Sequence, residues 1–335
     1  MDKIINNKVI LKNRPVGMPN IDNFQLVEEE VSNINYGEVL IKNIWLSLDP
    51  YMRGRMSDAK SYAQPIKIGD VITGGAVGEI ISSKCEKFKK GDIVEGFSLG
   101  WQKYSVISST LIRKIDPHLA PIQTSLGVLG MPGLTAYFGL FHVGRVIPGD
   151  NVVVSAASGA VGQIVGQLAK IAGCKVIGIA GGKEKCNYIK NKLSFDYAID
   201  YKSENINNKI KEFCPQGVNV YFDNVGGEIS DAIINNLAPY ARVAVCGVIS
   251  QYNLTQIEKG IRPSRALLTN QAKIEGFLVF QFAQQNHIAL PRLAHWLNNK
   301  QIIWKEDIIN GLANAPSAFI GLMNGKNFGK LLIKI

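Results

Sequence analysis

The stretch VVVSAASGAVGQIVGQLAK, residues 152–170, constrains the fold of this chain more than any other. It contains an apolar run typical of a buried strand, a turn with Gly159 and Gly162, and an amphipathic helix. This order is typical of the first βα unit of a dinucleotide-binding domain, in which small residues and a helix N-terminus accept a pyrophosphate. Ala157 stands where the motif usually has its first glycine, and a negative φ would tolerate it. Taken alone, the motif also fits a plain tight turn.

Strands and helices continue to alternate after this unit. Such alternation, with nearly continuous apolar strands, is typical of a Rossmann-type doubly wound parallel α/β sheet that helices cover on both faces. The expected strands are residues 151–155, 175–180, 197–200, 218–223, 242–246 and 273–280. The expected helices are residues 160–172, 184–193, 204–213, 229–236 and 288–299.

The first third of the chain has a different pattern, with short apolar runs separated by turn residues. Strands are expected at residues 38–48, 72–83, 91–98 and 101–108, and glycines inside them indicate bulges or sharp bends. A small antiparallel barrel or curled sheet fits this pattern. Because the last residues end in a strand-like run without a further crossover helix, they are expected to rejoin the first domain. The predicted division is therefore 1–130 with 303–335 around a central domain, 131–302.

Composition narrows the class of protein. The net charge of +10 is spread along 335 residues, which favours an ordinary solvated surface over a nucleic-acid surface, and the excess can alternatively help to attract an anionic ligand. No apolar run is long enough to cross a membrane and the first residues lack a signal-peptide core, so a cytoplasmic protein without membrane contact is expected. The cysteines are far apart and form no CxxC motif, which indicates reduced thiols and no metal site. They are Cys85, Cys174, Cys186, Cys214 and Cys246.

The end of the second expected strand indicates which dinucleotide binds. An NAD enzyme places an acidic residue there to bind the ribose hydroxyls. This chain instead has Gly181 and Gly182 at the strand end, and Lys183, Glu184 and Lys185 follow. The strand end itself therefore lacks an acidic residue, and two cations lie just after it. The pattern favours the 2′-phosphate of NADP(H), with Lys185 as its contact and Tyr201 as a neighbour. The lysines are otherwise ordinary residues of a first helical turn.

Several segments, taken in order, resemble one family. They are SLDPYMRGRMSD, LGMPGLTAY, AASGAVG, AGGKEKC, FDNVGG, CGVISQYN and NAPSAFIGLMNGKNFGK. Together they resemble the zinc-independent medium-chain dehydrogenase/reductases, within them the prostaglandin reductase and leukotriene 12-hydroxydehydrogenase family, and most of all its bacterial NADPH-dependent curcumin reductase branch. The resemblance spans essentially the whole chain.

The resemblance implies a Rossmann domain and an N-terminal GroES-like β-barrel domain, often in a homodimer. It implies NADPH-dependent reduction of the carbon-carbon double bond of α,β-unsaturated ketones and aldehydes, by hydride transfer to the β-carbon. The positions that it assigns to NADPH are Gly159, Ala160, Val161, Gly162, Lys185, Tyr201, Asn224, Cys246, Gly247, Val248, Ile249, Ser250, Tyr252, Phe277, Leu278, Val279 and Asn327.

Zinc-dependent members of the superfamily have a cysteine near the position of Ser47, and a Gly-His-Glu motif after it that this chain lacks. We therefore expect no metal, and hydroxyl donors to stabilise the enolate oxygen that forms in the reaction. Tyr252 is the first candidate donor and Tyr51 the second, although either can instead be a wall of the site. The alternative function is an NADPH:quinone reductase, and a more distant one is a non-catalytic NADPH- or RNA-binding protein.

Overall fold

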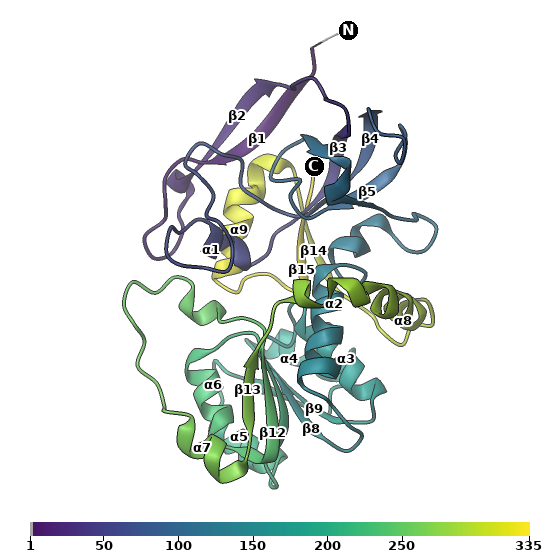
Figure 1. The fold of residues 1–335 in the computed structure, drawn as a ribbon. Coiled ribbons are helices and arrows are strands. Elements are labelled where there is room, and N and C mark those ends of the chain that lie inside the picture. The colour runs from purple at the N-terminus through teal and green to yellow at the C-terminus, as the bar shows by residue number, and fades with distance from the viewer. Residues whose placement is uncertain (1–2) are drawn as a thin grey trace. The chain divides into compact units, whose positions relative to one another are not determined.

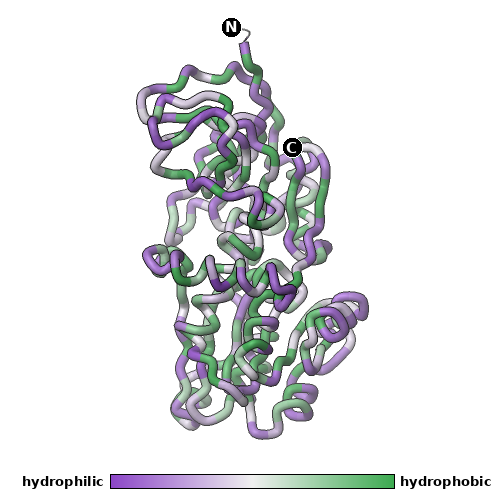
Figure 2. The backbone as a smooth tube through the Cα atoms, turned by 90° about the vertical axis from the view of Figure 1, so that its right-hand side faces the viewer, coloured by the Kyte–Doolittle hydropathy of each residue, from purple (hydrophilic) through white to green (hydrophobic). Residues whose placement is uncertain are grey.

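The computed structural model describes residues 3–335, which form two compact units. The first extends to Leu126 and also contains residues 306–327 and 331–335, whereas the second contains residues 127–305 and 328–330. Hydrophobic residues run through the interior of each unit, and many peripheral turns are hydrophilic (Figure 2). The chain thus enters the second unit once in a long continuous stretch and again for three residues near its end.

The first unit is organised around strand β3 (Glu38–Ser47) of a seven-stranded sheet. One edge of β3 pairs with β4 (Ala76–Ser83). The other edge is shared, because β6 (Tyr104–Ser108) pairs with residues 38–42 and β15 (Lys330–Lys334) pairs with residues 45–47. All of these pairings are antiparallel. The C-terminal strand therefore completes the sheet of the N-terminal unit, as the strand-like tail suggested.

Of the remaining elements of the first unit, the strands at residues 93–96, 112–114 and 306–310 also belong to this sheet, and the others lie outside it (Figure 1). A Cβ on Gly78 would lie 2.4 Å from the Lys42 carbonyl oxygen, and the β3–β4 register shifts next to this pair, so the glycine marks a bulge as expected. These elements are β1 (Ile5–Leu11), β2 (Phe24–Glu30), α1 (Tyr51–Arg55), β5 (Ile93–Gly96), β7 (Ile112–Lys114), β14 (Glu306–Asn310) and α9 (Ala315–Met323).

The second unit contains a six-stranded parallel sheet in the order β10-β9-β8-β11-β12-β13. This is the classical doubly wound order, in which the chain starts at the centre and builds outward in both directions. The predicted fold class is confirmed. The strands are β8 (Asn151–Val154), β9 (Lys175–Ala180), β10 (Tyr197–Asp200), β11 (Val218–Asp223), β12 (Leu237–Val245) and β13 (Lys273–Gly276).

Helices cover both faces of this sheet (Figure 1). Helices α5 (Ile206–Phe213), α6 (Gly227–Ile234) and α7 (Ser264–Asn270) contribute to one core with the inner strands. On the other face, α2 (Met131–Phe138) packs beside α3 (Gly162–Ile171), which also packs on β8 and β9. Two further helices are α4 (Lys183–Asn191) and α8 (Asn286–Asn298).

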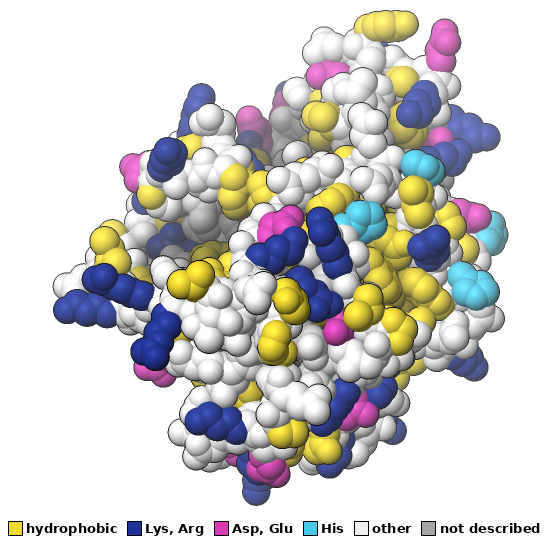
Figure 3. Space-filling model, turned by 60° about the horizontal axis from the view of Figure 1, so that its bottom comes forward, with side chains coloured by type: hydrophobic (Ala, Val, Ile, Leu, Met, Phe, Trp, Pro, Cys, Tyr) yellow, Lys and Arg dark blue, Asp and Glu magenta, His cyan; other side chains and the backbone are white. Residues whose placement is uncertain are grey.

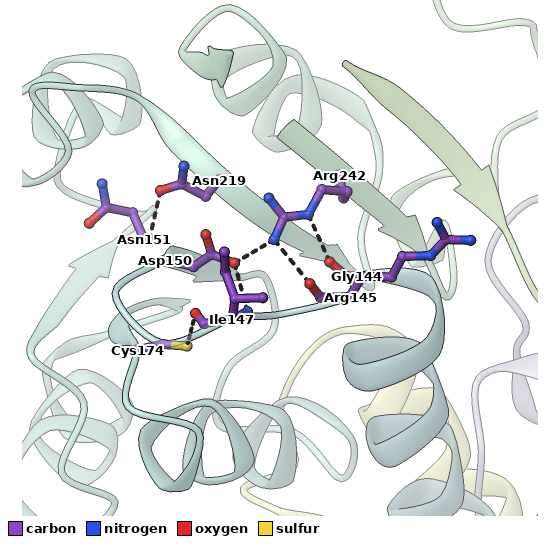
Figure 4. A network of polar contacts seen from close by, with 8 residues as sticks. All are labelled: Gly144, Arg145, Ile147, Asp150, Asn151, Cys174, Asn219 and Arg242. Carbon is purple, nitrogen blue, oxygen red and sulfur yellow. Dashed lines mark hydrogen bonds and ion pairs between the residues drawn. The ribbon is translucent and has the colours of Figure 1, made fainter. Parts of the chain in front are cut away.

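An ionic network lies near the amino ends of β8 and β12 in this unit (Figure 4). The Arg242 guanidinium pairs with Asp150 and donates to the carbonyl oxygens of Gly144 (3.0 Å) and Arg145 (3.2 Å). The Asp150 carboxylate also accepts from the Ile147 N–H at 3.0 Å, within the turn IPGD at residues 147–150. These bonds fix the segment that leads into β8.

Two surface properties bear on function. Lys and Arg side chains are scattered over the face drawn in Figure 3, with acidic and hydrophobic side chains between them. None of the helices within residues 3–335 has both the length and the apolar character needed to cross a membrane.

Candidate cofactor and active site

The carboxyl ends of the parallel strands form the candidate site. Strands β8 and β11 pair at the centre of the sheet, where the strand order reverses, and ligands of doubly wound sheets bind at such a switch point. Each residue that sequence reasoning assigned to the cofactor, except Asn327, follows the carboxyl end of one of the six strands. The fold therefore gathers these residues at one edge of one sheet, within the second unit.

The turn after β8 is shaped by close backbone contacts. A Cβ on Gly162 would lie 2.3 Å from the Ala156 carbonyl oxygen, so only glycine fits where α3 begins. Ala156 has a φ of +48°, a left-handed conformation that costs an L-residue about 1–2 kcal/mol. Among the described residues, Ala157 does not have a positive φ. Alanine can therefore replace the first glycine of the motif here. The backbone strain of this turn is therefore at Ala156, one residue before the first glycine position of the motif.

The loop after β9 brings Tyr201 and the glycines together. A Cβ on Gly181 would lie 2.8 Å from the Tyr201 ring, so the ring lies against this glycine. Gly182 has a φ of +94° and precedes α4, whose first turn carries the half-buried Lys185. A cation and a phenol at a helix N-terminus are suited to binding a phosphate group.

Asp200, at the end of β10, is a residue of this loop that sequence reasoning missed. Its carboxylate accepts from the N–H groups of Gly182 (2.7 Å) and Lys202 (3.1 Å) and from Ser203 Oγ (3.0 Å). Burial alone would raise the pKa of Asp200, but these hydrogen bonds hold the pKa below its ordinary value. The carboxylate is thus occupied in fixing the Gly182 loop.

Asp223, the last residue of β11, organises the loops at the centre of the site. Its carboxylate is 2% exposed and accepts hydrogen bonds from both backbone and hydroxyl donors. The donors are Ser155 Oγ (3.2 Å), Tyr221 Oη (2.8 Å), Val225 N (2.9 Å), Gly226 N (2.9 Å) and Ser230 Oγ (2.8 Å). The Asp223 backbone oxygen accepts from the N–H groups of Cys246 and Gly247. One residue therefore ties together the turns after β8, β11 and β12.

Asn224 and Cys246 are held by the same loops. The Asn224 side-chain amide donates to the Ser155 carbonyl oxygen at 2.8 Å, and its backbone N–H donates to Ser155 Oγ at 2.9 Å. Burial, with a smaller contribution from Asp223, raises the pKa of the Cys246 thiol to about 12. The thiol is therefore neutral at physiological pH and lines the site as a small, uncharged group.

Tyr252 follows the short helical turn Ile249–Gln251 after β12. Its hydroxyl lies 3.4 Å from where a Cβ on Gly247 would be, and its side chain is half-buried. Ser250 Oγ donates to the Val225 carbonyl oxygen at 2.6 Å, which joins this turn to the loop after β11. The Tyr252 hydroxyl is thus held over the backbone at the carboxyl end of β12.

Phe277 belongs to the core through its ring. The ring is buried and packs edge-on against Phe222 at a centroid distance of 6.1 Å. Leu278 and Val279 continue past the carboxyl end of β13 and are half-buried. The backbone of residues 277–279, rather than the Phe277 ring, is what this segment offers to a ligand.

Tyr51 lies in the first unit, on α1. Its ring stacks on Phe97 with centroids 5.2 Å apart, and its buried hydroxyl has no hydrogen-bond partner among the described residues. Burial, then the charge of Asp49, raises the pKa of Tyr51 well above its ordinary value. An unpaired buried hydroxyl is costly, which fits a group that serves a ligand.

Asn327 also belongs to the first unit, although the next residues do not. Phe328, Gly329 and Lys330 belong to the second unit, where Gly329 forms a parallel β-bridge with Gly159 of the dinucleotide turn. Part of the KNFGK tail thus lies directly on the predicted nucleotide-binding turn.

Comparison with known proteins identifies the family of this chain. Residues 7–115 match a family model described as the N-terminal domain of oxidoreductase, and residues 160–295 match one described as zinc-binding dehydrogenase. The NADPH-dependent curcumin reductase of Escherichia coli is 41% identical over 98% of this chain and 97% of its own length. The chain belongs to the curcumin, alkenal and prostaglandin reductase family of medium-chain dehydrogenase/reductases.

Two further relatives extend the comparison. The NADP⁺-dependent 2-alkenal reductase of Nicotiana tabacum is 41% identical over 100% of this chain and 98% of its own length. The crystal structure of CurA from Vibrio vulnificus in complex with NADPH superposes with a TM-score of 0.93 at 42% identity, covering 98% of each chain. The predicted family is therefore confirmed.

The description of the second family model raises the question of a metal. Among residues 3–335, the structure contains no group of three or more His, Cys, Asp or Glu side chains that could hold an ion. Ser47, at the position expected for a zinc-binding cysteine, is 3% exposed and donates its hydroxyl to Asp49.

Proposed function

We propose that this protein is an NADPH-dependent reductase of the carbon-carbon double bond of α,β-unsaturated ketones and aldehydes, working without a metal. The observation that carries the proposal is the set of loops at the switch point of the parallel sheet, which begins with the Gly159–Gly162 turn. Membership in a family with curcumin and alkenal reductases supports the reaction class.

The residues of the second unit fit NADPH. Gly159, which lacks a side chain that would keep a ligand from the backbone, and the N-terminus of α3 suit a pyrophosphate. Lys185 and Tyr201 would hold the 2′-phosphate, while Asn224 and residues 246–252 and 277–279 would line the ribose and nicotinamide. We keep Asn327 as a cofactor contact and residues 131–302 as the NADPH domain, with residues 1–130 and 303–335 as the catalytic domain.

When bound, NADPH supplies the hydride that adds to the β-carbon of the substrate. Negative charge then develops on the carbonyl oxygen, and a hydroxyl donor aimed at that oxygen would stabilise it by about 2.7–4 kcal/mol. Tyr252 is our first candidate donor and Tyr51 the second. The raised pKa of Tyr51 keeps its hydroxyl protonated, as a donor requires.

A substrate and cofactor panel tests the reaction class. NADPH and NADH oxidation is followed by absorbance with enones, enals and quinones as acceptors. We expect turnover of enones and enals with NADPH. Turnover of quinones alone would support an NADPH:quinone reductase, and RNA binding without turnover of any acceptor would support the non-catalytic alternative.

Lys185 provides a test of cofactor choice. Lys185→Ala removes a charge-assisted hydrogen bond, so the KM for NADPH is expected to rise about tenfold or more while that for NADH stays constant. Lys183→Ala, at the first residue of the same helix, is the matched control and should leave both values unchanged. A wild-type preference for NADH would contradict the assignment.

Tyr252 and Tyr51 are compared by substitution with phenylalanine. Tyr252→Phe is expected to lower kcat about 100-fold with a smaller effect on NADPH affinity, since it removes only a hydroxyl and keeps the ring. An unimpaired Tyr252→Phe together with an impaired Tyr51→Phe would exchange their roles.

We also propose a homodimer and a cytoplasmic location. In the part of the chain that the structure describes, β13 is an edge strand whose outer side pairs with no other strand, so a second copy has a place to pair. The five cysteines are free thiols, which fits a reducing compartment. Light scattering on the purified protein checks the dimer.

A further inference from the structure

Two glutamines on α3 are buried although helix α3 is otherwise packed with apolar side chains. Gln163 is 0% exposed and Gln167 is 5% exposed. They are four residues apart, so they lie on the same face of the helix. Buried amides are costly unless their hydrogen-bonding groups are paired, and these two follow directly after the dinucleotide turn.

Each glutamine binds the backbone of an extended segment with both ends of its amide. Gln163 accepts from the Lys305 N–H at 2.8 Å and donates to the Lys305 carbonyl oxygen at 3.2 Å. Gln167 accepts from the Ile303 N–H at 2.9 Å and donates to the Ile303 carbonyl oxygen at 2.7 Å. Each side chain thus pairs with a backbone N–H and C=O, as a neighbouring strand would in a sheet. Together they hold residues 303–305 to the helix.

Among the hydrogen bonds described for these two glutamines, those of Gln163 continue toward the nucleotide-binding turn. The Lys305 carbonyl oxygen also accepts from the Lys330 N–H at 2.9 Å, and a Cβ on Gly329 would lie 2.2 Å from that same oxygen. Gly329 in turn forms its β-bridge with Gly159. The Lys305 ammonium lies 4.6 Å from the Phe328 ring, which meets the Tyr188 ring edge-on.

We propose that Gln163 is a positioning residue for NADPH, because it sets the Lys305 backbone on which the tail residues 328–330 rest against the Gly159 turn. The inference rests on the proposed function. Gln167 makes an equivalent pair of bonds to Ile303, but these do not lead to the tail. Substitutions at these two buried glutamines are therefore expected to change the affinity for NADPH by different amounts.

The test measures NADPH affinity and thermal stability in Gln163→Met and Gln167→Met. Each change replaces an amide by an apolar side chain of similar length, so both variants should lose a similar amount of stability. Gln163→Met is expected to raise the Kd for NADPH about tenfold, with kcat at saturating NADPH nearly unchanged. Gln167→Met is expected to keep the Kd within about twofold of the wild-type value.

Gln163→Glu gives a second readout when it is compared with Gln167→Glu, which adds the same charge to the same face of the helix. A protonated glutamic acid can donate to the Lys305 oxygen and accept from the Lys305 N–H, whereas a carboxylate can only accept. NADPH affinity relative to wild type should therefore recover as the pH falls from 8.5 to 6. A ratio that does not change with pH would contradict the two-point contact.

Two other results would overturn the inference. An unchanged Kd in Gln163→Met, or an equal rise in both methionine variants, would assign the glutamines to stability alone. A wild-type protein that binds no NADPH would overturn the proposed function itself, so the two failures are distinguishable.

Discussion

The amino and carboxyl ends of the second unit's sheet hold their loops in opposite ways. At the amino end, the Arg242 guanidinium and the Asp150 carboxylate pair with each other and with neighbouring backbone groups (Figure 4). At the carboxyl end, the Asp223 carboxylate is bonded by N–H groups and hydroxyls, and within residues 3–335 no lysine or arginine pairs with it. An ion pair fixes the loops at the amino end of the sheet, whereas glycines and backbone donors shape the loops at the carboxyl end, where a ligand can bind.

Breaking the amino end should give the largest effect on stability. Arg242→Met leaves the Asp150 carboxylate, which is 6% exposed, without its cation, and is expected to lower the free energy of unfolding by about 3 kcal/mol. The Kd for NADPH of the folded variant should stay within about twofold of wild type. Urea unfolding and a fluorescence titration measure the two quantities, and a large loss of NADPH affinity would show that the ends are coupled.

A substitution that disturbs the turn at the carboxyl end should lower the affinity for NADPH as well as the stability of the fold. Gly162→Ala places a methyl group 2.3 Å from the Ala156 carbonyl oxygen, which must shift the turn at a cost of about 1–3 kcal/mol. We expect NADPH affinity to fall by more than tenfold.

Gly159→Ala is the comparison for this turn, because Gly159 is proposed to let the ligand approach the backbone. Its added Cβ would lie 3.1 Å from the same Ala156 oxygen, a contact that a small adjustment relieves. Equal losses of NADPH affinity in the two variants would mean that close contact with the ligand, not backbone crowding, requires both glycines.

Cysteine labelling gives the smallest and most local comparison. Burial raises the pKa of Cys174 near the amino end to about 11 and that of Cys246 at the carboxyl end to about 12, so both are almost fully protonated at pH 8.5. A hydrogen bond with Ser109 lowers the pKa of Cys85, which should react first with a thiol reagent. NADPH should slow the labelling of Cys246 but not of Cys174, as mass spectrometry of labelled peptides would show.

The sequence predicts the strands well where an apolar run ends at a turn. Strands β9, β10 and β11 begin and end as expected, because turn residues bound each run. Strand β12 begins five residues earlier than predicted and includes Pro239, a residue that sheets tolerate only at edges and irregularities. The β11–β12 register shifts between Val218 and Val220, and this irregularity accommodates the proline.

The candidate site is predictable in its ligand-facing glycines but not in the groups that hold them. The AASGAVG turn and the cationic loop before Lys185 are local patterns. The bonds from Asp200 to the Gly182 loop, and from Gln163 to Lys305, join residues far apart in sequence. No local periodicity distinguishes such side chains from ordinary surface residues, so only the folded chain identifies them.

The bridge between Gly159 and Gly329 has a consequence for how the protein is made. The dinucleotide turn is synthesised about 170 residues before Gly329. Domains generally begin to fold during synthesis from the N-terminal side. Here the nucleotide-binding unit is completed only when residues 328–330 have been synthesised, so a nascent chain that has not reached them presents an unfinished cofactor site.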